Sequence, residues 1–169
     1  MDYAVLPQLA DVVDRAIFAR AYATSYGGDE TVANMVAGDS QTITAGQNGI
    51  VSVMSGGQQD ISSGGTGTVS TMNNGGSQFV DDGGTGAVST MSGGIQNIYY
   101  GGTGIIGTMH NGSQIIGGAA FDAIGTIDTM SGGKQMIARG GTGTLSVMYG
   151  GSQTIASGGT GTVSTLNNG

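Results

Sequence analysis

A methionine recurs at a nearly fixed interval along most of this chain, and no other feature constrains its fold as strongly. The interval is 18, 19 or 21 residues, and the positions are Met35, Met54, Met72, Met91, Met109, Met130, Met148 and, in the last unit, Leu166. Repeats of this length are typical of solenoids, in which each repeat is one coil stacked on the next. The sequence therefore predicts about eight coils of 18–19 residues.

Other residue types recur at fixed distances from these methionines, which we call the anchors. An aliphatic residue lies three positions before each anchor, at Val32, Val51, Val69, Val88, Ile106, Ile127, Leu145 and Val163. A Gln-x-aliphatic segment follows each anchor except the last, with its glutamine at Gln41, Gln59, Gln78, Gln96, Gln114, Gln135 and Gln153. Extra residues occur only near glycines, at 75–76 and 117–121, so we expect them in turns that leave the stack in register.

Two short segments rich in β-branched residues, separated by glycine pairs, make up each repeat. Such segments favour strands, and glycine pairs favour tight turns. We therefore predict an all-β fold, a parallel β-helix or β-solenoid. At about 4.8 Å per coil, eight coils make a rod of roughly 35–40 Å. Methionine suits its interior because the unbranched side chain fills irregular space.

The spacing also predicts side-chain directions. Val69 and Met72 are three apart, so both reach the core only if a corner or bulge lies at 70–71. Gln96 and Ile98 are two apart and should share a face. We expect an inward glutamine ladder whose amides bond between coils; the alternative is an outward glutamine beside a local bulge.

The chain ends differ from the repeat. Residues 8–25 predict an amphipathic capping helix with Pro7 at its start, and we divide the chain into this N-terminal region, 1–26, and a solenoid domain, 27–169.

Asp11 and Arg15 interrupt the continuous apolar segment that a signal peptide would need, so we expect either a removed leader or no export by that route. Residues 158–169 lack the glutamine half, which predicts an open strand edge.

Composition excludes several classes of partner. The net charge is −7 with only 4 Lys and Arg, too few for a nucleic-acid surface. Cysteine is absent, which excludes disulfides and thiolate metal sites. No apolar run approaches the roughly 18 residues that span a bilayer, so we expect no transmembrane segment in this chain.

Residues for catalysis or metal binding are sparse. His110 is the single histidine, and we expect it to be a solvent-facing turn residue. Asp81-Asp82 and Asp29-Glu30 are adjacent acids, but a calcium-binding nonapeptide would need Asp where Val69 stands. The recurring GGTG lacks the lysine of a phosphate-binding loop. We expect no enzyme, no cofactor and no metal.

Hydroxyl side chains recur instead. One row lies two residues before the anchor, at Ser70, Ser89, Ser146 and Ser164, and a second comprises Thr66, Thr85, Thr103, Thr142 and Thr160. Such rows could bind a repetitive partner, carry sugars, or bind ice, although Asn48 and Ile124 interrupt the threonine row. Ser and Thr also simply suit turns and strands.

The pattern in 140-GGTGTLSVMYGGSQTIAS-157 resembles the AIDA-type repeat of self-associating autotransporter adhesins of Gram-negative bacteria, over residues 27–169. That resemblance implies a right-handed β-helix displayed at the cell surface or secreted, acting in adhesion, autoaggregation and biofilm formation. It implies surface glycans as partners and, in some members, heptose on repeat serines, so Ser70, Ser89, Ser146 and Ser164 are candidate O-glycan acceptors. The chain holds no translocator, so we expect an excised passenger or a smaller protein with the same repeat.

The leading hypothesis is therefore a non-enzymatic extracellular structural or adhesive module that mediates self-association or surface adhesion. One alternative is an acceptor substrate for an O-glycosyl (heptosyl) transferase. A second is an ice-binding solenoid, and a catalytic role ranks last. Chemistry particular to this chain should lie in residues that do not repeat, namely Tyr99, Tyr100, His110 and 117–122.

Overall fold

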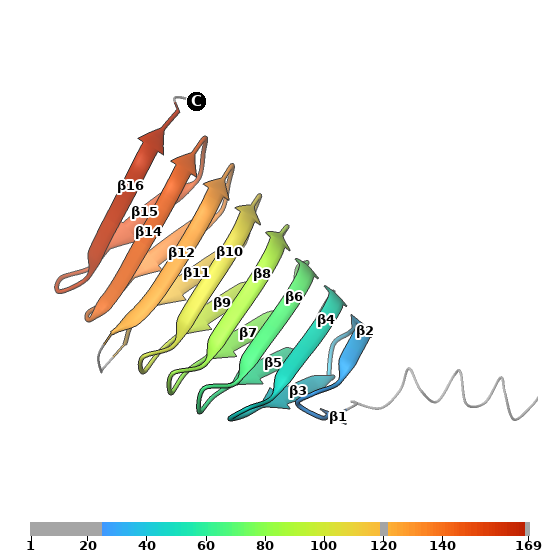
Figure 1. Ribbon diagram of the computed structural model, residues 1–169. Coiled ribbons are helices and arrows are strands. Elements are labelled where there is room, and N and C mark those ends of the chain that lie inside the picture. Colours follow the sequence, from blue (N-terminus) through green and yellow to red (C-terminus); the bar gives the residue numbers. More distant parts are fainter. Residues whose placement is uncertain (1–24, 119–121, 168–169) are drawn as a thin grey trace, which may run out of the picture.

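The protein is a β-solenoid of about eight coils. The computed structural model describes residues 25–118 and 122–167, and this part of the chain is all-β, with no helix. Its strands form two parallel sheets of eight strands each. Figure 1 shows the sheet of longer strands in front and the sheet of shorter strands behind it. The predicted fold class is confirmed.

Each coil supplies one long and one short strand. The long sheet comprises β2 (Thr31–Met35), β4 (Asn48–Met54), β6 (Thr66–Met72), β8 (Thr85–Met91), β10 (Thr103–Met109), β12 (Ala123–Met130), β14 (Gly141–Met148) and β16 (Thr160–Leu166). The short sheet comprises β1 (Ser25–Tyr26), β3 (Ser40–Ile43), β5 (Gln58–Ile61), β7 (Ser77–Val80), β9 (Ile95–Ile98), β11 (Ser113–Ile116), β13 (Lys134–Ile137) and β15 (Ser152–Ile155). We number the coils from coil 1 (β2 and β3) to coil 7 (β14 and β15), and β16 begins an eighth.

The core is a column between the two sheets. The methionines from Met35 to Met130 have no exposed surface, and the aliphatic residues three before them are also buried. The short strands add a second buried row, formed by Ile43, Ile61, Val80, Ile98, Ile116 and Ile137. Like residues therefore stack on like residues along the rod, and each coil buries an apolar face that it could not bury alone.

The predicted irregularity between the aliphatic residue and the methionine is present in the long strands. Pairing between β6 and β8 proceeds from Val69↔Val88 to Thr71↔Thr90, so it passes over the serine between them. Because one residue is left out of the ladder, the alternation of inward and outward side chains shifts by one position after Ser70. Both Val69 and Met72 therefore point inward.

The glutamines form an inward ladder, as predicted. Each amide nitrogen donates to the amide oxygen of the preceding coil's glutamine at 2.6–2.8 Å, for Gln59, Gln78, Gln96, Gln114, Gln135 and Gln153. Gln41, at the N-terminal end, donates instead to the carbonyl oxygens of Gly27 and Glu30. The ladder is satisfied and points in one direction, and the alternative of outward glutamines is wrong.

Inward glycines make room for this ladder. Gly67 and its equivalents face the core in the long strands, between two outward residues. A Cβ on Gly67 would collide with the side chains of Ile61 and Gln59. The last glycine of the GGTG motif, here Gly67, is thus required by close approach, whereas the first, Gly64, is required by its positive φ of 79°.

The chain ends and the insertion leave the stacking of the coils unchanged. The predicted capping helix over 8–25 lies outside the described residues except for Ser25, which begins β1 and so extends the short sheet ahead of residue 27. The insertion at 117–121 leaves the register intact, because Thr103 pairs with Ile124 and Met109 with Met130. Within the described residues β15 and β16 are the last strands of the short and the long sheet.

Candidate functional site

The outer face of the long sheet carries hydroxyl columns that run the length of the rod. The first column is Asn48, Thr66, Thr85, Thr103, Ile124, Thr142 and Thr160. The second is Ile50, Thr68, Ala87, Ile105, Thr126, Thr144 and Thr162, and the third is Val53, Thr71, Thr90, Thr108, Thr129, Val147 and Thr165. Neighbouring members pair directly, so the columns are in register. We call this surface the hydroxyl face.

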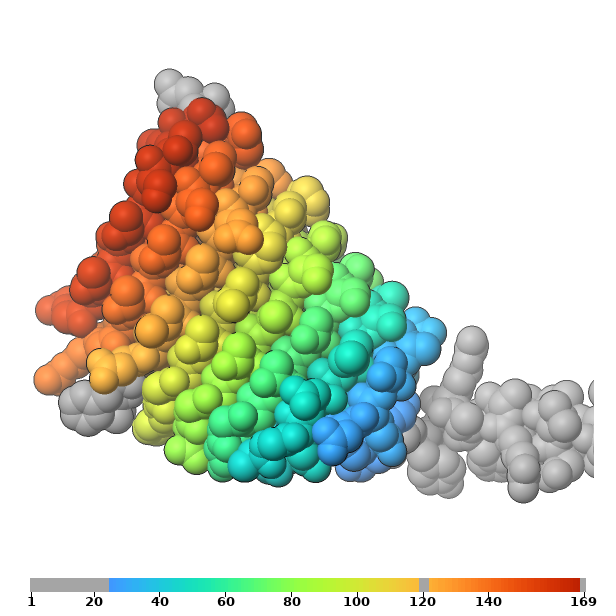
Figure 2. Space-filling model, in the orientation of Figure 1, coloured from blue at the N-terminus to red at the C-terminus, as the bar shows by residue number. Residues whose placement is uncertain are grey.

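Figure 2 shows the hydroxyl face, on which the coils follow one another as parallel bands. The sequence revealed only the first of its columns. The second and third could have been found, because they lie four residues and one residue before each methionine. All of their members except Ala87 are β-branched and therefore restricted in χ1, so the face is stiff as well as regular.

The predicted serine row lies on this face at the position that pairing passes over. Ser70, Ser89 and Ser164 are exposed, whereas Ser146 is half-buried. Gly107 and Asp128 occupy the same position in coils 5 and 6 and interrupt the row. Ser52 is a fourth exposed member that sequence analysis missed, although it lies two residues before Met54. The exposed hydroxyls are open to a large enzyme.

Asp81 and Asp82 lie in the turn that follows β7. Burial raises the pKa of the Asp81 carboxyl above its ordinary value, and the nearby charges of Asp82 and then Asp60 add to the rise. The Ser63 hydroxyl donates to Asp82 at 3.1 Å, which ties this turn to the one below it. The two acids are therefore crowded by a third on β5, which the sequence spacing did not indicate.

His110 is exposed in the turn after β10, as predicted, and its Nδ1 lies 2.9 Å from the Ser131 hydroxyl of the next coil. No group of three or more His, Cys, Asp or Glu residues within 25–118 and 122–167 has the geometry to hold a metal ion. No helix in the same part of the chain is long and apolar enough to cross a membrane.

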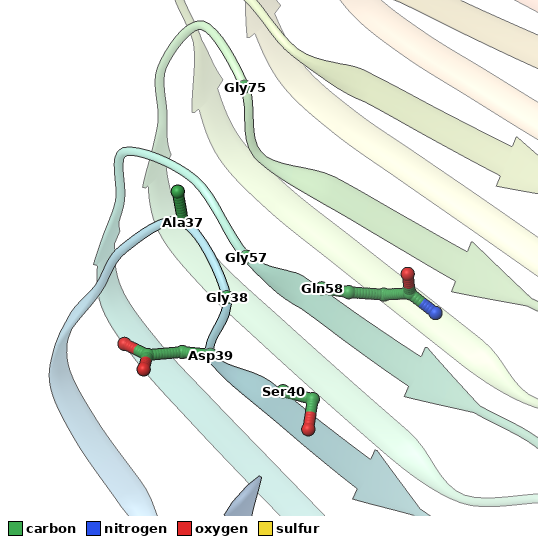
Figure 3. A pocket seen from close by; sticks show the side chains of 7 residues that line it. All are labelled: Ala37, Gly38, Asp39, Ser40, Gly57, Gln58 and Gly75. Carbon is green, nitrogen blue, oxygen red and sulfur yellow. The ribbon is translucent and has the colours of Figure 1, made fainter. Parts of the chain in front are cut away.

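Among the hollows on the described part of the chain, two differ in size and lining. The larger, about 440 Å³, is lined by Ala37, Gly38, Asp39, Ser40, Gly57, Gln58 and Gly75 (Figure 3). The Asp39 carboxylate accepts from the Val36 amide of its own turn at 3.0 Å, and the side chains of Asp39 and Gln58 point in opposite directions. A smaller apolar hollow of about 100 Å³ lies on the outer short sheet beside Ile115 and Met136. Neither hollow gathers groups for catalysis.

Residues that break the repeat gather on one edge of the rod, formed by the turns from each short strand to the next long strand. We call it the turn edge; its described turns are 27–30, 44–47, 62–65, 81–84, 99–102, 117–118 with 122, 138–140 and 156–159. Asp81-Asp82 and Tyr99-Tyr100 occupy successive turns, and Arg139 lies two turns beyond the tyrosines. His110 lies on the opposite edge, so the structure separates it from the other non-repeating residues.

No protein-family model, curated protein or solved structure matches this chain. The resemblance to an adhesin repeat therefore rests on the sequence pattern, and it remains a prediction.

Proposed function

We propose that this protein is a non-enzymatic structural and adhesive module that acts outside the cell or at its surface, mediating self-association or surface adhesion. The observation that carries this proposal is the hydroxyl face, a stiff sheet surface with three columns of mostly threonine in register. The repeat pattern supports assignment to the autotransporter adhesins and a role in biofilm formation. A right-handed coil is proposed with it, because parallel crossovers adopt that hand.

A regular face suits a partner that is itself regular. Rows spaced by about 4.8 Å present the same hydroxyl repeatedly, so a chain of sugars or another sheet can make many equivalent contacts. Each neutral hydrogen bond contributes little in water, but many linked contacts give high avidity. The backbone under the threonines is fixed by pairing on both sides, so binding orders few additional groups.

The test is binding of the whole chain, coated on beads, to immobilised bacterial and host polysaccharides. The double substitution Thr126→Lys and Thr144→Lys, in the second column, should reduce bead capture at least tenfold. Thr42→Lys with Thr154→Lys, exposed on the short sheet, is the matched control and should leave capture unchanged. Capture that is absent for the native chain, or equal for both double variants, would contradict adhesion through the hydroxyl face.

Exposure of the serine row favours a second candidate, an acceptor substrate for an O-glycosyl (heptosyl) transferase. Ser70, Ser89 and Ser164 are exposed and take no part in backbone pairing between long strands. Co-expression with such a transferase should add heptose masses that Ser→Ala substitutions at these three positions remove. An unmodified intact mass would dismiss this role. Ser146, half-buried, should be modified least.

An ice-binding role ranks third. Thr66-Gly67-Thr68, Thr142-Gly143-Thr144 and Thr160-Gly161-Thr162 each present paired hydroxyls, but Ile50, Ala87, Ile105 and Ile124 interrupt the two columns. Lack of thermal hysteresis in the purified chain would eliminate it.

A further inference from the structure

Asparagine is followed directly by glycine at four places, Asn48-Gly49, Asn74-Gly75, Asn111-Gly112 and Asn168-Gly169. Such a pair is chemically labile, because the backbone nitrogen after the asparagine can attack the side-chain amide and glycine has no Cβ to obstruct that approach. The last pair lies outside the described residues. The other three occupy different environments, so the fold should make their reactivities unequal.

Asn111 lies in the turn after β10, at a place where four other coils have glycine: Gly56, Gly93, Gly132 and Gly150. A Cβ on Gly132 would lie 2.3 Å from the carbonyl oxygen of His110 in the preceding turn. The stacked turns therefore favour glycine here, and packing between coils does not call for a larger residue. Asn111 is also exposed, so water and base reach its side chain.

The Asn111 side chain folds back onto its own backbone. The Gly112 amide donates to Asn111 Oδ1 at 2.8 Å. The carbonyl carbon Cγ is one C=O bond, about 1.23 Å, from Oδ1, so it lies within about 4 Å of the Gly112 nitrogen. Reacting atoms that are poised for attack lie roughly 3–3.5 Å apart, so a small rotation of the side-chain amide brings the two atoms into reach.

The other two described pairs lack this arrangement. Asn48 and Gly49 belong to β4, which pairs with β2 on one side and with β6 on the other. Pairing in the ladder holds this backbone extended. The Asn74 side-chain oxygen lies against Gly93 of the next turn, where an added Cβ would collide with it. The side chain of Asn74 thus packs on a neighbouring coil.

We propose that Asn111 is a site of spontaneous deamidation, and that in the folded chain it reacts faster than Asn48 or Asn74. The Gly112 nitrogen forms a bond to Cγ of Asn111, and the bond from Cγ to the side-chain nitrogen breaks. Base carries the proton of the Gly112 amide to the departing amino group, which leaves as ammonia. Water then opens the succinimide at either carbonyl and yields aspartate or isoaspartate. Water is the only co-reactant, and nothing is oxidised or reduced.

Both products alter the edge of the rod opposite the turn edge. Each adds a negative charge, and isoaspartate also lengthens the main chain by one methylene. The turn has little room for it, because the Gly112 carbonyl accepts from the Lys134 amide at 3.0 Å and a Cβ on Gly112 would lie 2.8 Å from the Gly94 carbonyl oxygen. Isoaspartate should therefore loosen the stack at coils 4, 5 and 6. The site is independent of the hydroxyl face and of adhesion.

Ageing of the whole native chain in heavy-oxygen water at mildly alkaline pH tests the proposal, with peptide mapping by mass spectrometry. In the folded chain Asn111 should take up heavy oxygen at least about tenfold faster than Asn48 and Asn74. In concentrated urea the fold no longer distinguishes the three pairs, so their rates should converge.

Asn111→Gly is the matched control, because it places at this position the residue that four other coils carry there. The variant should fold and should gain no heavy oxygen in this turn. Asn111→Gln keeps the amide but closes a larger ring slowly, so it should also stop the conversion. Hydrogen exchange should become faster in coils 4, 5 and 6 of the aged native chain, but not in the aged Asn111→Gly chain.

Equal rates at the three described pairs of the folded chain, or a faster rate at Asn48 or Asn74, would overturn the proposal. Persistence of the tenfold ratio in urea would overturn it as well, because the local sequence and not the fold would then set the rate. Unchanged hydrogen exchange after conversion would contradict the loosening of the stack.

Discussion

At the scale of single residues, the molecule combines fully satisfied interior groups with a few strained or crowded ones on its edge. The glutamine ladder represents the first kind and Asp81 the second. Both follow from one principle, that a buried polar group is costly unless a partner meets it. In a stack each partner is the same residue of the neighbouring coil, so a single substitution affects three coils.

Replacement of one interior glutamine should therefore be costly. Gln96→Leu removes the donor to Gln78 and the 2.8 Å acceptor for Gln114, whose amide keeps only 3.4 Å contacts to the carbonyls of Gly104 and Thr126. At about 1–3 kcal/mol for each lost ladder bond, the free energy of unfolding should fall by about 2–6 kcal/mol. Gln153→Leu, at the half-buried end of the ladder, is the matched control and should cost under about 1.5 kcal/mol. Urea denaturation measures both; equal losses would contradict the ladder.

Asp81 should make stability depend on pH in the opposite sense to an ion-paired acid. Its pKa is raised by burial and by Asp82 and Asp60, so the folded state binds the proton more tightly than the unfolded state. Stability is therefore gained as the pH falls through the folded-state pKa and lost as it rises above the unfolded value. Asp81→Asn should raise the unfolding temperature at pH 7, and the gain should vanish near pH 3. Asp128→Asn controls for the change in net charge.

At the scale of the strand, glycines are required for two different reasons. Gly86 faces inward in β8, where a Cβ would press on Val80 and Gln78. Gly83, in the turn before it, has no atom within 4 Å of its Cβ position but has a φ of 74°. The first is required by packing and the second by backbone conformation.

Alanine substitution should separate the two. Gly86→Ala forces β7 and β8 apart, and overpacking of this kind typically costs about 1–3 kcal/mol or more, with disturbance of the glutamine ladder in addition. Gly83→Ala should cost only about 1 kcal/mol, the strain of one left-handed residue. The free energy of unfolding in guanidinium measures both. A smaller loss for Gly86→Ala than for Gly83→Ala would show that the inward approach is wrong.

The elements also show what the sequence could and could not predict. Strands, coil number, the Val and Met columns and the skipped residue at Ser70 were predictable, because a stack repeats each environment and so repeats its residue. Inward Gly67 was missed, because glycine was assigned to turns alone. The second and third hydroxyl columns were missed because only the row nearest the glycine motif was followed.

At the scale of the whole molecule, the residues that repeat and the residues that break the repeat form different surfaces. The hydroxyl face could be predicted in part from Thr66 and its equivalents, but the turn edge could not. Its residues, Asp82, Tyr100 and Arg139, are far apart in sequence and of unlike type, and only the stacking of coils places them in one line. The repeating residues form the two sheets and the hydroxyl face, and the residues that break the repeat place charged and aromatic groups on the turn edge.

Sedimentation velocity of the native chain over a wide dilution series is the most direct test of the central claim, that this solenoid is a self-associating adhesive module. The account predicts a monomer at low concentration that shifts to a dimer as concentration rises. A single monomeric species at every concentration would contradict it.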